Sequence, residues 1–484
     1  MIAKLSASKL RKRLVIVGNG LATGRLLDEL CARNTLGKFE VFVFGEETSG
    51  CYNRVQLSRV LSGAAPSEIM LKDADWYAHH GIVFHAGARV LRLDLAERRV
   101  IGSRGVVQPF DALVLATGSR AVVPTLPGLH NDDRLLDGAF VFRTLDDCEA
   151  ILGSVVPDQP AVVLGGGLLG LEAAKGLADL GMRVTVLERS SGPMSRQLDL
   201  AGQTVLSQHL QRLGIGCVGG VGVQSVYGTE RVEGVRLTDG SDVACKLLVM
   251  ACGIQPRTEL ARSAGLPVKK ALLVNEWLSV EGTPHVHGIG ECVEIDGELF
   301  GTVAPIWAQA EVLADVLSEV ARERGYHPTS TYTKLKVAGI DVASFGDTGE
   351  NFAGELVTVT EPNRGLYVRL RIDQERLVGA QLVGDSRLAA RLLQYHDQRI
   401  PVPEHRLDLL ASEAAVLEDG CASREVCNCH HVSEEAIVGV IGRGALDLAS
   451  VALATRAGTG CGSCHSAVSS LIRQHAPQPK ATAA

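Results

Sequence analysis

Hydrophobic residues along the chain occur in short uninterrupted runs, each closed by a glycine loop and followed by a stretch with helical spacing. The first run covers residues 14–17, and the strand after its helix ends at Glu46. The second run begins at residue 161, and the strand after its helix ends at Glu188. Short apolar runs that alternate with helices are typical of buried parallel strands. The pattern predicts an α/β protein with two Rossmann-like halves that are weak internal repeats.

The elements after these two halves predict smaller domains. Each half contains a further apolar strand that ends in a glycine, at 112–118 and at 247–253. Alternating strand-like runs between positions 331 and 384, followed by a helical stretch at 386–395, predict a small α+β domain. Residues 400–425 contain two prolines and several charges and predict a linker with one short helix. The block after the linker is cysteine-bearing and helical in pattern, and the residues Val-Ser-Glu-Glu at 432–435 predict an N-cap at Ser433.

Composition excludes several classes of protein. A length of 484 residues allows about three domains of roughly 150 residues each. The net charge of -7 and the aromatic content of 4% give neither a positive field nor a stacking surface, so we expect no nucleic-acid partner. The longest apolar stretch, 161–171, is shorter than the ~20 residues of a membrane span, so we expect no membrane partner. The basic start, 1–13, leads into a strand and not into a signal sequence, which predicts a cytoplasmic protein with reduced thiols.

The first glycine loop has the features of a dinucleotide site. Gly18 allows a tight turn after the strand, and Gly20 lets the backbone approach a phosphate group. The third glycine of the usual pattern is replaced by Thr23, with Gly24 one place later. Glu46, at the end of the next strand, can accept hydrogen bonds from ribose hydroxyls. Because the N-terminus of the following helix attracts anions, this loop predicts a pyrophosphate site.

The second glycine loop is a complete G-x-G-x-x-G. Its three glycines are Gly165, Gly167 and Gly170, and Glu188 supplies the acid at the end of the next strand. A carboxylate there would bond a free 2′-hydroxyl and repel a 2′-phosphate, which favours NADH. Arg189 is placed to face a phosphate, so NADPH stays the alternative coenzyme.

Glu172, two residues after the third glycine of this loop, has two interpretations. It is either an acid favoured by the N-terminal dipole of its helix or a side chain that acts beside the nicotinamide. The sequence leaves both interpretations open.

Four cysteines near the C-terminus predict a metal centre. Cys427 and Cys429 form a C-x-C pair, and Cys461 and Cys464 form a C-x2-C pair. Four thiolates bind either zinc or an iron-sulfur cluster. The glycines around Cys461 let backbone N–H groups approach bridging sulfides, which favours an iron-sulfur cluster over zinc. The neighbouring histidines, 430 and 431, are interpreted as ligands, as tuning groups or as surface residues.

The remaining cysteines show no pairing that points to redox chemistry. A redox-active C-x4-C pair cannot form at the first loop, because Cys51 is followed five places later by Gln56. Cys51 is interpreted as an ordinary cysteine, with a lone peroxidase-like thiol as the alternative. Cys421 breaks the spacing of the metal motif and is expected to be free. The following cysteines are expected to be small core residues in helices or strands, or beside them: Cys31, Cys148, Cys217, Cys245, Cys252 and Cys292.

Several segments together resemble a known family. They span residues 14 to about 385 and read GNGLATGRLLDEL, FGEETSGCYNRVQLSRVLSG, ALVLATGSR, GGGLLGLEAAKGL, VHGIGECVEIDG, VAPIWAQAEVLADVL and TKLKVAGIDVASFGD. The combination resembles the two-dinucleotide flavoprotein reductases, and more closely the flavin half of the large subunit of assimilatory NAD(P)H nitrite reductase. The C-terminal block resembles the bacterioferritin-associated ferredoxin [2Fe-2S] domain, which follows the flavin half in that subunit.

The resemblance implies FAD at the first loop and a nicotinamide coenzyme at the second. The helix that opens at 304–307 would direct its positive end at the flavin and stabilise the anionic reduced form. The flavin itself is expected to carry the chemistry, with Glu172 and Arg59 as candidate catalytic side chains. The FAD-binding residues implied by the resemblance are Gly18, Gly20, Glu46, Arg54, Thr117, Gly118, Gly290 and Glu291. The residues expected at the nicotinamide coenzyme are Gly165, Gly167, Gly170, Glu188 and Gly253.

These assignments predict a domain order and a function. The expected domains are an FAD-binding domain at 1–125 and 275–325, an NAD(P)H-binding domain at 126–274, a small α+β domain at 326–400, a linker at 401–425, a [2Fe-2S] domain at 426–475 and a disordered tail at 476–484. The leading hypothesis is the NADH-oxidising electron-transfer subunit of an assimilatory nitrate reductase, with the molybdenum catalytic subunit as its partner. No sirohaem domain precedes Ala484, so we do not expect this chain itself to reduce nitrite. One alternative is a stand-alone reductase for a ferredoxin, a rubredoxin or a split nitrite reductase. Another is a redox-sensing or docking module; the two intact nucleotide loops argue against it, because a docking protein needs no NADH site.

Overall fold

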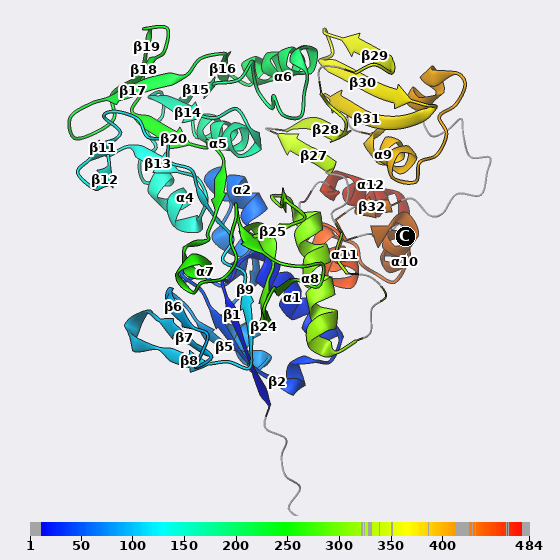
Figure 1. Cartoon of the computed structure of the whole chain (residues 1–484). Helices are drawn as coiled ribbons and strands as arrows, with labels where there is room; N and C mark the ends of the chain where they lie inside the picture. Colours follow the sequence, from blue (N-terminus) through cyan, green and yellow to red (C-terminus); the bar gives the residue numbers. More distant parts are fainter. Residues whose placement is uncertain are drawn as a thin grey trace, which may run out of the picture. The chain divides into compact units, whose positions relative to one another are not determined.

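The computed structural model contains two compact units, which are described separately (Figure 1). Unit 1 comprises Met1–Arg54, Pro66–Arg120 and Ile254–Thr329, and unit 2 comprises Val55–Ala65, Ala121–Gly253 and Ser330–Ala484. The domain boundaries expected from the sequence stay a prediction. The structure describes residues 11–320, 323, 325–327, 332–337, 339–349, 352–385, 387–411, 425–427, 429, 430, 432–460, 462 and 464–476.

Unit 1 is built on a six-stranded sheet in the order β23-β24-β9-β1-β2-β5. Its strands are parallel apart from β23. The central strand β1 is buried from Leu14 to Val17, as expected for an apolar run covered on both faces. Helix α1 packs against α8 in the same unit. The bounds are β1 Lys12–Val17, α1 Leu21–Ala32, β2 Phe39–Phe44, β5 Val83–His85, β9 Ala112–Leu115, β23 Ser279–Val280, β24 Thr283–Gly288 and α8 Val303–Ser318.

Unit 2 contains a five-stranded parallel sheet in the order β13-β20-β14-β15-β16. Helix α5 packs against β14 and β15. Helix α4 begins at a capping box in which the Thr144 side chain accepts from the Asp147 N–H. The predicted second Rossmann-like half is confirmed. The bounds are β13 Ala139–Val141, α4 Leu145–Leu152, β14 Pro160–Leu164, α5 Leu168–Asp179, β15 Arg183–Glu188, α6 Leu200–Arg212, β16 Gly216–Gly219 and β20 Leu247–Met250.

A five-stranded antiparallel sheet in the order β27-β28-β31-β30-β29 follows in unit 2, with α9 packed on it. It confirms the predicted small α+β domain. Strand β29 was not predicted, because as an edge strand it is mostly exposed and lacks an apolar run. The bounds are β27 Tyr332–Val337, β28 Ile340–Gly346, β29 Glu355–Glu361, β30 Leu366–Asp373, β31 Arg376–Val383 and α9 Ala389–Asp397.

The C-terminal block folds as a two-stranded ladder, β32 and β33, followed by three helices. The predicted N-cap is confirmed, since the Ser433 side chain accepts from the Ala436 N–H at 3.2 Å. The stretch with helical pattern forms two helices, because the chain turns at Gly444, whose φ is +104°, and Asp447 caps the second helix. The bounds are β32 Glu425–Cys427, β33 Val432–Ser433, α10 Glu434–Gly442, α11 Leu448–Thr455 and α12 His465–His475.

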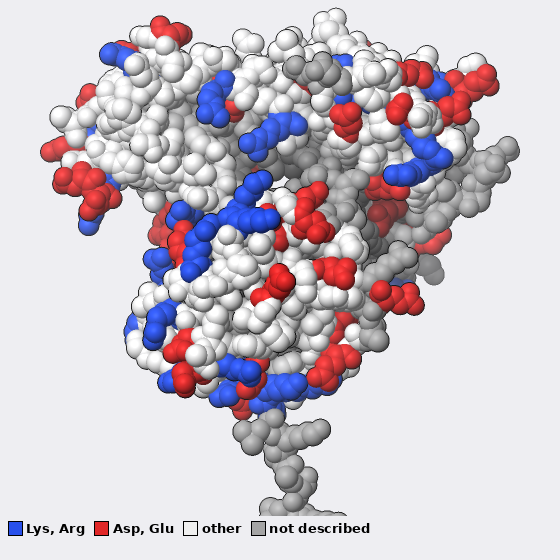
Figure 2. Space-filling model, in the orientation of Figure 1, with Lys and Arg blue, Asp and Glu red and all other residues white. Residues whose placement is uncertain are grey.

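Lys and Arg side chains are interspersed with Asp and Glu on the face shown in Figure 2. Within the described residues, no helix is long and apolar enough to cross a membrane. Among residues 401–411, the described start of the predicted linker, Arg406–Leu410 forms a short 3₁₀ helix. The other elements are β3 Cys51–Tyr52, α2 Leu57–Leu61, β4 Met70–Lys72, α3 Ala74–His79, β6 Val90–Asp94, β7 Arg99–Gly102, β8 Val107–Pro109, β10 Ser119–Ala121, β11 His130–Asn131, β12 Arg134–Leu135, β17 Val223–Tyr227, β18 Gly234–Leu237, β19 Asp242–Ala244, β21 Ile254–Pro256, α7 Glu259–Ser263, β22 Leu272–Leu273, β25 Val293–Ile295 and β26 Glu298–Leu299.

Candidate functional site

The first glycine loop, in unit 1, joins β1 to α1 and is shaped to hold a phosphate group. Gly18 has a φ of +107°, and a Cβ added to it would lie 2.0 Å from the Ala116 carbonyl oxygen, so only glycine fits. A Cβ added to Gly20 would meet no atom within 4 Å, so the loop is open on that side. No side chain caps α1 at Gly20. The N–H groups of its first turn are therefore available to an anion.

Thr23 explains the departure from the usual glycine pattern. Its hydroxyl donates to the Gly18 carbonyl at 2.7 Å, and the residue is fully buried. At the matching position of the second loop, a Cβ on Gly170 would lie 1.9 Å from the Gly165 carbonyl oxygen. The first loop thus leaves room for a side chain that bonds the carbonyl. Gly24 has its own reason to lack a side chain, since an added Cβ would lie 2.7 Å from the sulfur of Cys51.

Glu46 lies at the carboxyl end of β2 and forms an ion pair with Arg257. The Arg89 guanidinium lies 3.7 Å from its other oxygen. Arg257 is itself held by the strand end at 117–118, because its N–H donates to the Gly118 carbonyl at 2.9 Å and its carbonyl accepts from the Thr117 hydroxyl at 3.0 Å. Thr117 and Gly118 therefore position an arginine beside the Glu46 carboxylate. Arg257 was not predicted, because none of the sequence motifs covers the residues between Gly253 and β24.

A second group of polar side chains in unit 1 surrounds Glu291. The Ser119 hydroxyl donates to Glu291 Oε2 at 2.5 Å. Arg54 donates to Glu47 Oε1 at 2.5 Å and lies 5.1 Å from the centre of the Tyr52 ring. Burial alone would lower the pKa of Arg54. The interactions with Tyr52, Glu47 and Glu291 outweigh burial, so the pKa is raised overall. Ser119 and Glu47 were not predicted from the sequence.

Helix α8 begins next to this group and supports its backbone. The helix was expected to open at 304–307 and begins at Val303, with no side-chain cap at Thr302. The buried Gln309 accepts the Gly290 N–H at 2.8 Å and so fixes a residue whose φ is +88°. The open glycine loop, the acid at the end of β2 and an uncapped helix N-terminus are the donor set that a dinucleotide requires. The residues of unit 1 therefore fit FAD.

The second glycine loop, in unit 2, positions its acid by backbone contacts. Glu188 Oε2 accepts the Gly166 N–H at 2.6 Å, and Oε1 accepts the Ser190 N–H at 2.8 Å. A Cβ added to Gly167 would meet no atom within 4 Å, and no side chain caps α5 there. Gly253 has a φ of +107° and is open in the same way. The carboxylate is thus fixed at the mouth of an open loop, which fits a nicotinamide dinucleotide.

The two candidate catalytic side chains differ in burial. Glu172, in α5, is largely removed from water, and this burial raises the pKa of its carboxyl to about 7 despite a hydrogen bond from Ser58. A carboxyl with a pKa near neutrality is suited to hold or release a proton at working pH. Arg59 is exposed and donates to Gln56 Oε1 at 3.0 Å.

The thiolate centre lies in the C-terminal block of unit 2. Cys427, Cys429 and Cys464 are all buried, and the sulfurs of Cys427 and Cys429 lie 3.7 Å apart. Hydrogen bonds from Cys429 and Cys464 lower the pKa of the Cys427 thiol, which places these three predicted ligands together. These three thiols are not by themselves arranged to hold a single metal ion, and neither is any other group of three His, Cys, Asp or Glu side chains among the described residues. Cys461 lies outside the described residues, as does Cys421.

The backbone around the centre suits a cluster. Gly458 lies before the second cysteine pair, and Gly462 lies between its two cysteines. Their φ values are +87° and +74°, a backbone conformation that favours glycine. Buried thiols next to such a loop fit a [2Fe-2S] cluster. His430 is half-buried and lies 2.7 Å from the Thr459 hydroxyl, so it is not a free surface histidine. His431 lies outside the described residues.

Most of the other cysteines are buried or half-buried. Cys51 is fully buried, and burial raises the pKa of its thiol to about 11, which disfavours the peroxidase-like alternative. Cys148, Cys245 and Cys292 are buried as expected, whereas Cys31 and Cys217 are half-buried. The expectation for Cys252 was wrong: β20 ends at Met250, and Cys252 is exposed in the loop that follows. Cys252 directly precedes Gly253, which is open to solvent, so Cys252 does not lie in the core.

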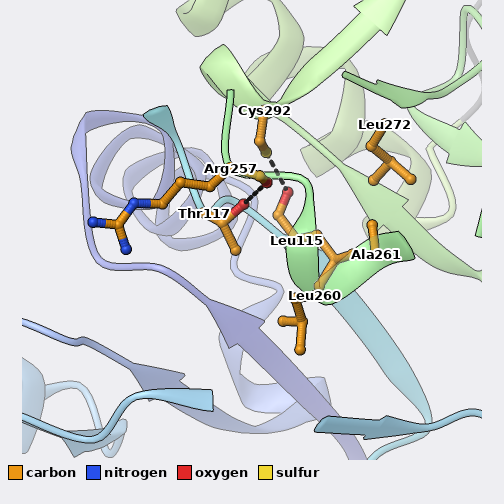
Figure 3. A pocket seen from close by; sticks show the side chains of 7 residues that line it. All are labelled: Leu115, Thr117, Arg257, Leu260, Ala261, Leu272 and Cys292. Carbon is orange, nitrogen blue, oxygen red and sulfur yellow. Dashed lines mark hydrogen bonds between the residues drawn. The ribbon is translucent and has the colours of Figure 1, made fainter. Parts of the chain in front are cut away.

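One pocket of unit 1 lies under the end of β9 (Figure 3). The Cys292 thiol inside it donates to the Leu115 carbonyl at 3.4 Å, and the Arg257 side chain points out of it. Because it offers a substrate no free charge, we assign it no role in the chemistry. The lining residues are Leu115, Thr117, Arg257, Leu260, Ala261, Leu272 and Cys292.

Comparison with known families agrees with these sites. The chain belongs to the pyridine nucleotide-disulphide oxidoreductase family, whose model matches residues 12–312. Residues 425–474 match the BFD-like [2Fe-2S] binding domain, and residues 332–400 match the rubredoxin NAD+ reductase C-terminal domain. The chain is therefore an NAD(P)H oxidoreductase of the flavoprotein type with a [2Fe-2S] domain.

Two curated relatives are similar to this chain over almost its whole length. The chain is 34% identical over 471 residues to a nitrite reductase [NAD(P)H] of Bacillus subtilis (strain 168), covering 96% of this chain and 58% of the relative. It is 33% identical over 467 residues to the assimilatory nitrate reductase electron transfer subunit of the same organism, covering 96% and 60%. The chain thus spans about three fifths of the length of these relatives.

Solved structures show the same fold. The putidaredoxin reductase–putidaredoxin complex matches with a TM-score of 0.73 at 23% identity, over 83% of this chain and 96% of that chain. The NADH:rubredoxin oxidoreductase of Clostridium acetobutylicum matches with a TM-score of 0.67 at 22% identity, over 83% and 99%.

Proposed function

We propose that this protein oxidises NADH and delivers the electrons through its C-terminal cluster to a separate acceptor protein. The observation that carries the proposal is the grouping of buried Cys427, Cys429 and Cys464 in a chain with two open glycine loops. Bound FAD would supply the step from two-electron to one-electron transfer, and the cluster would supply one-electron exit. Cys427, Cys429, Cys461 and Cys464 are the proposed cluster ligands.

The side chains of the chain have defined roles in this proposal. Gly18, Gly20 and Glu46 would bind the pyrophosphate and ribose of FAD, with Arg257 orienting the carboxylate. The uncapped end of α8 would stabilise negative charge on the reduced flavin. In the second loop, Glu188 would accept hydrogen bonds from the coenzyme ribose.

We further propose that the acceptor is the molybdenum catalytic subunit of an assimilatory nitrate reductase. The name of one relative, an assimilatory nitrate reductase electron transfer subunit, supports this partner. The predicted reduced state of the thiols agrees with a cytoplasmic location. Other one-electron acceptor proteins are the alternatives.

The cluster assignment is tested by the metal content of the purified protein. About two irons and two sulfides per chain are expected, with the visible spectrum of a [2Fe-2S] cluster. Zinc in place of iron would overturn the cluster and leave NADH oxidation by the flavin intact.

The partner is tested by turnover with purified acceptors. NADH-dependent nitrate reduction is expected when the molybdenum subunit is added, and not without it. If nitrate reduction stays absent with an active molybdenum subunit, the nitrate reductase assignment is wrong.

A second candidate function is a reductase for a rubredoxin or ferredoxin. The match of residues 332–400 to the rubredoxin NAD+ reductase C-terminal domain favours it. It predicts faster NADH oxidation with rubredoxin than with the molybdenum subunit, measured at equal acceptor concentrations.

A further inference from the structure

The two cysteine pairs are joined by a contact between side chains that are not themselves cysteines. His430 directly follows Cys429, and Thr459 lies two residues before Cys461. The chain between them passes through α10 and α11. His430 Nε2 nevertheless lies 2.7 Å from Thr459 Oγ1. One hydrogen bond thus connects the end of the C-x-C pair with the start of the C-x2-C pair.

The proton of this hydrogen bond can be assigned from the partners of Thr459. The Thr459 hydroxyl has a single hydrogen, and it donates this hydrogen to the Arg456 carbonyl at 2.9 Å. Toward His430 the hydroxyl oxygen therefore accepts, and His430 carries a hydrogen on Nε2. That nitrogen is engaged with Thr459, so it is not available to a metal ion.

A second histidine contacts the same loop. His465 follows Cys464, and its Nε2 lies 2.8 Å from the Gly458 carbonyl, which can only accept. The loop itself turns sharply, since Arg456 has a φ of +65° and Gly458 a φ of +87°. The loop before the second cysteine pair is therefore held by one histidine from each pair.

Such contacts matter because the four thiolates come from distant parts of the chain. Closing a long loop costs conformational entropy, and hydrogen bonds behind metal ligands reduce the freedom of those ligands. We propose that His430 and Thr459 form a tie that positions the two cysteine pairs as one ligand set. His430 is then a positioning residue and not a ligand. The inference rests on the cluster assigned under the proposed function.

The tie is tested on the full-length protein with its cluster, under anaerobic conditions. Thr459→Val removes the hydroxyl and keeps the shape of the side chain, whereas Thr459→Ser keeps the hydroxyl. His430→Phe removes the donor from the other end. The two readouts are the rate of iron release to a chelator and the EPR spectrum of the dithionite-reduced cluster.

Loss of the tie is expected to speed iron release about tenfold in Thr459→Val and in His430→Phe, with altered EPR g-values. Thr459→Ser should stay within about twofold of the wild type, and the double variant should release iron no faster than the single ones, because both changes break the same bond. The matched control is His475→Phe, which removes an exposed histidine near the end of α12.

Several outcomes would overturn the tie. Wild-type release rates and spectra in both Thr459→Val and His430→Phe would show that the contact positions nothing. Strong nitrogen coupling to the wild-type cluster in pulsed EPR, lost in His430→Phe, would make His430 a ligand. A wild-type protein that contains zinc and no cluster would instead refute the proposed function on which the tie rests.

Discussion

In the first glycine loop, the Thr23 hydroxyl bonds the carbonyl of Gly18, whereas Gly170 in the second loop has no room for any side chain. The two loops therefore reach the same turn in different ways. A buried carbonyl that loses its donor costs free energy, since no water replaces the lost partner. We therefore expect the Thr23 hydroxyl to contribute to the stability of the FAD-bound protein.

Thr23→Val is expected to lower the free energy of unfolding of unit 1 by about 1–2 kcal/mol, because the valine leaves the Gly18 carbonyl without its hydroxyl donor. The thermal midpoint of FAD release, followed by flavin fluorescence, should fall by about 3–6 °C. Thr23→Ser keeps the hydroxyl and should retain most of the midpoint. Equal midpoints in the valine and serine variants would show that the hydrogen bond does not stabilise the loop.

Glu188 predicts the choice of coenzyme. Its carboxylate is fixed by the N–H groups of Gly166 and Ser190 and would repel a 2′-phosphate. Glu188→Gln should lower kcat/KM for NADH about tenfold and reduce the preference for NADH over NADPH, in steady-state assays with an artificial acceptor. Arg189→Ala is the control, because it should leave that preference unchanged. A wild-type protein that prefers NADPH, with the preference lost in Arg189→Ala, would reverse the assignment.

Glu172 predicts a pH dependence of stability. Burial raises the pKa of its carboxyl from 4.5 to about 7, so between these values the folded protein holds a proton that the unfolded chain releases. Stability from this group is therefore present at low pH and is lost as the pH rises through about 7. Glu172→Gln should remove this loss, on the order of 2 kcal/mol, measured as thermal midpoints at pH 5 and pH 8. The exposed Glu149→Gln is the control and should follow the wild type; a Glu172→Gln profile parallel to the wild type would refute the shift.

Among the elements, α6 and β30 of unit 2 are joined by one carboxylate. Asp199 caps α6 by accepting the Gly202 N–H at 2.9 Å, and it also accepts from the Tyr367 hydroxyl at 2.6 Å. Arg369 forms an ion pair with the same carboxylate. Burial raises the pKa of Asp199, but the bonds from Tyr367, Gly202 and Arg369 outweigh it and lower the pKa overall. The small α+β domain is thereby attached to the second Rossmann-like half.

Asp199→Ala is expected to destabilise unit 2 by about 3 kcal/mol, because it removes a helix cap and leaves Arg369 without its buried partner. Urea unfolding followed by the near-ultraviolet signal of the aromatic residues would measure the change. Asp447→Ala, which removes the exposed cap of α11, is the control and should cost only about 1 kcal/mol. Equal losses in the two variants would contradict a connecting role for Asp199.

Helices and strands that a short local sequence pattern determines were predicted correctly. Glycine loops followed by helices, the N-cap at Ser433 and the strands of the small domain have short-range signals, and the structure contains them. Contacts between distant positions have no such signal. Arg257 beside Glu46 and Ser119 beside Glu291 depend on which strands are neighbours in the sheet, and the edge strand β29 lacks the apolar run that would reveal it.

For the molecule as a whole, the kinds of site that the chain contains indicate where electrons leave it. The two glycine loops come first and the thiolate centre comes last, and no cysteine pair of the C-x4-C type follows the first loop. The buried Cys51 thiol, with its raised pKa, offers no alternative exit at that position. We therefore predict that electrons leave through the cluster.

Anaerobic titration with NADH, followed by visible absorption and low-temperature EPR, tests this claim most directly. In the wild type, NADH should bleach the flavin and then produce the EPR signal of a reduced [2Fe-2S] cluster. Cys427→Ser should keep the bleaching and lose or alter the cluster signal. A flavin that bleaches while a cluster reducible by dithionite stays oxidised would contradict the account.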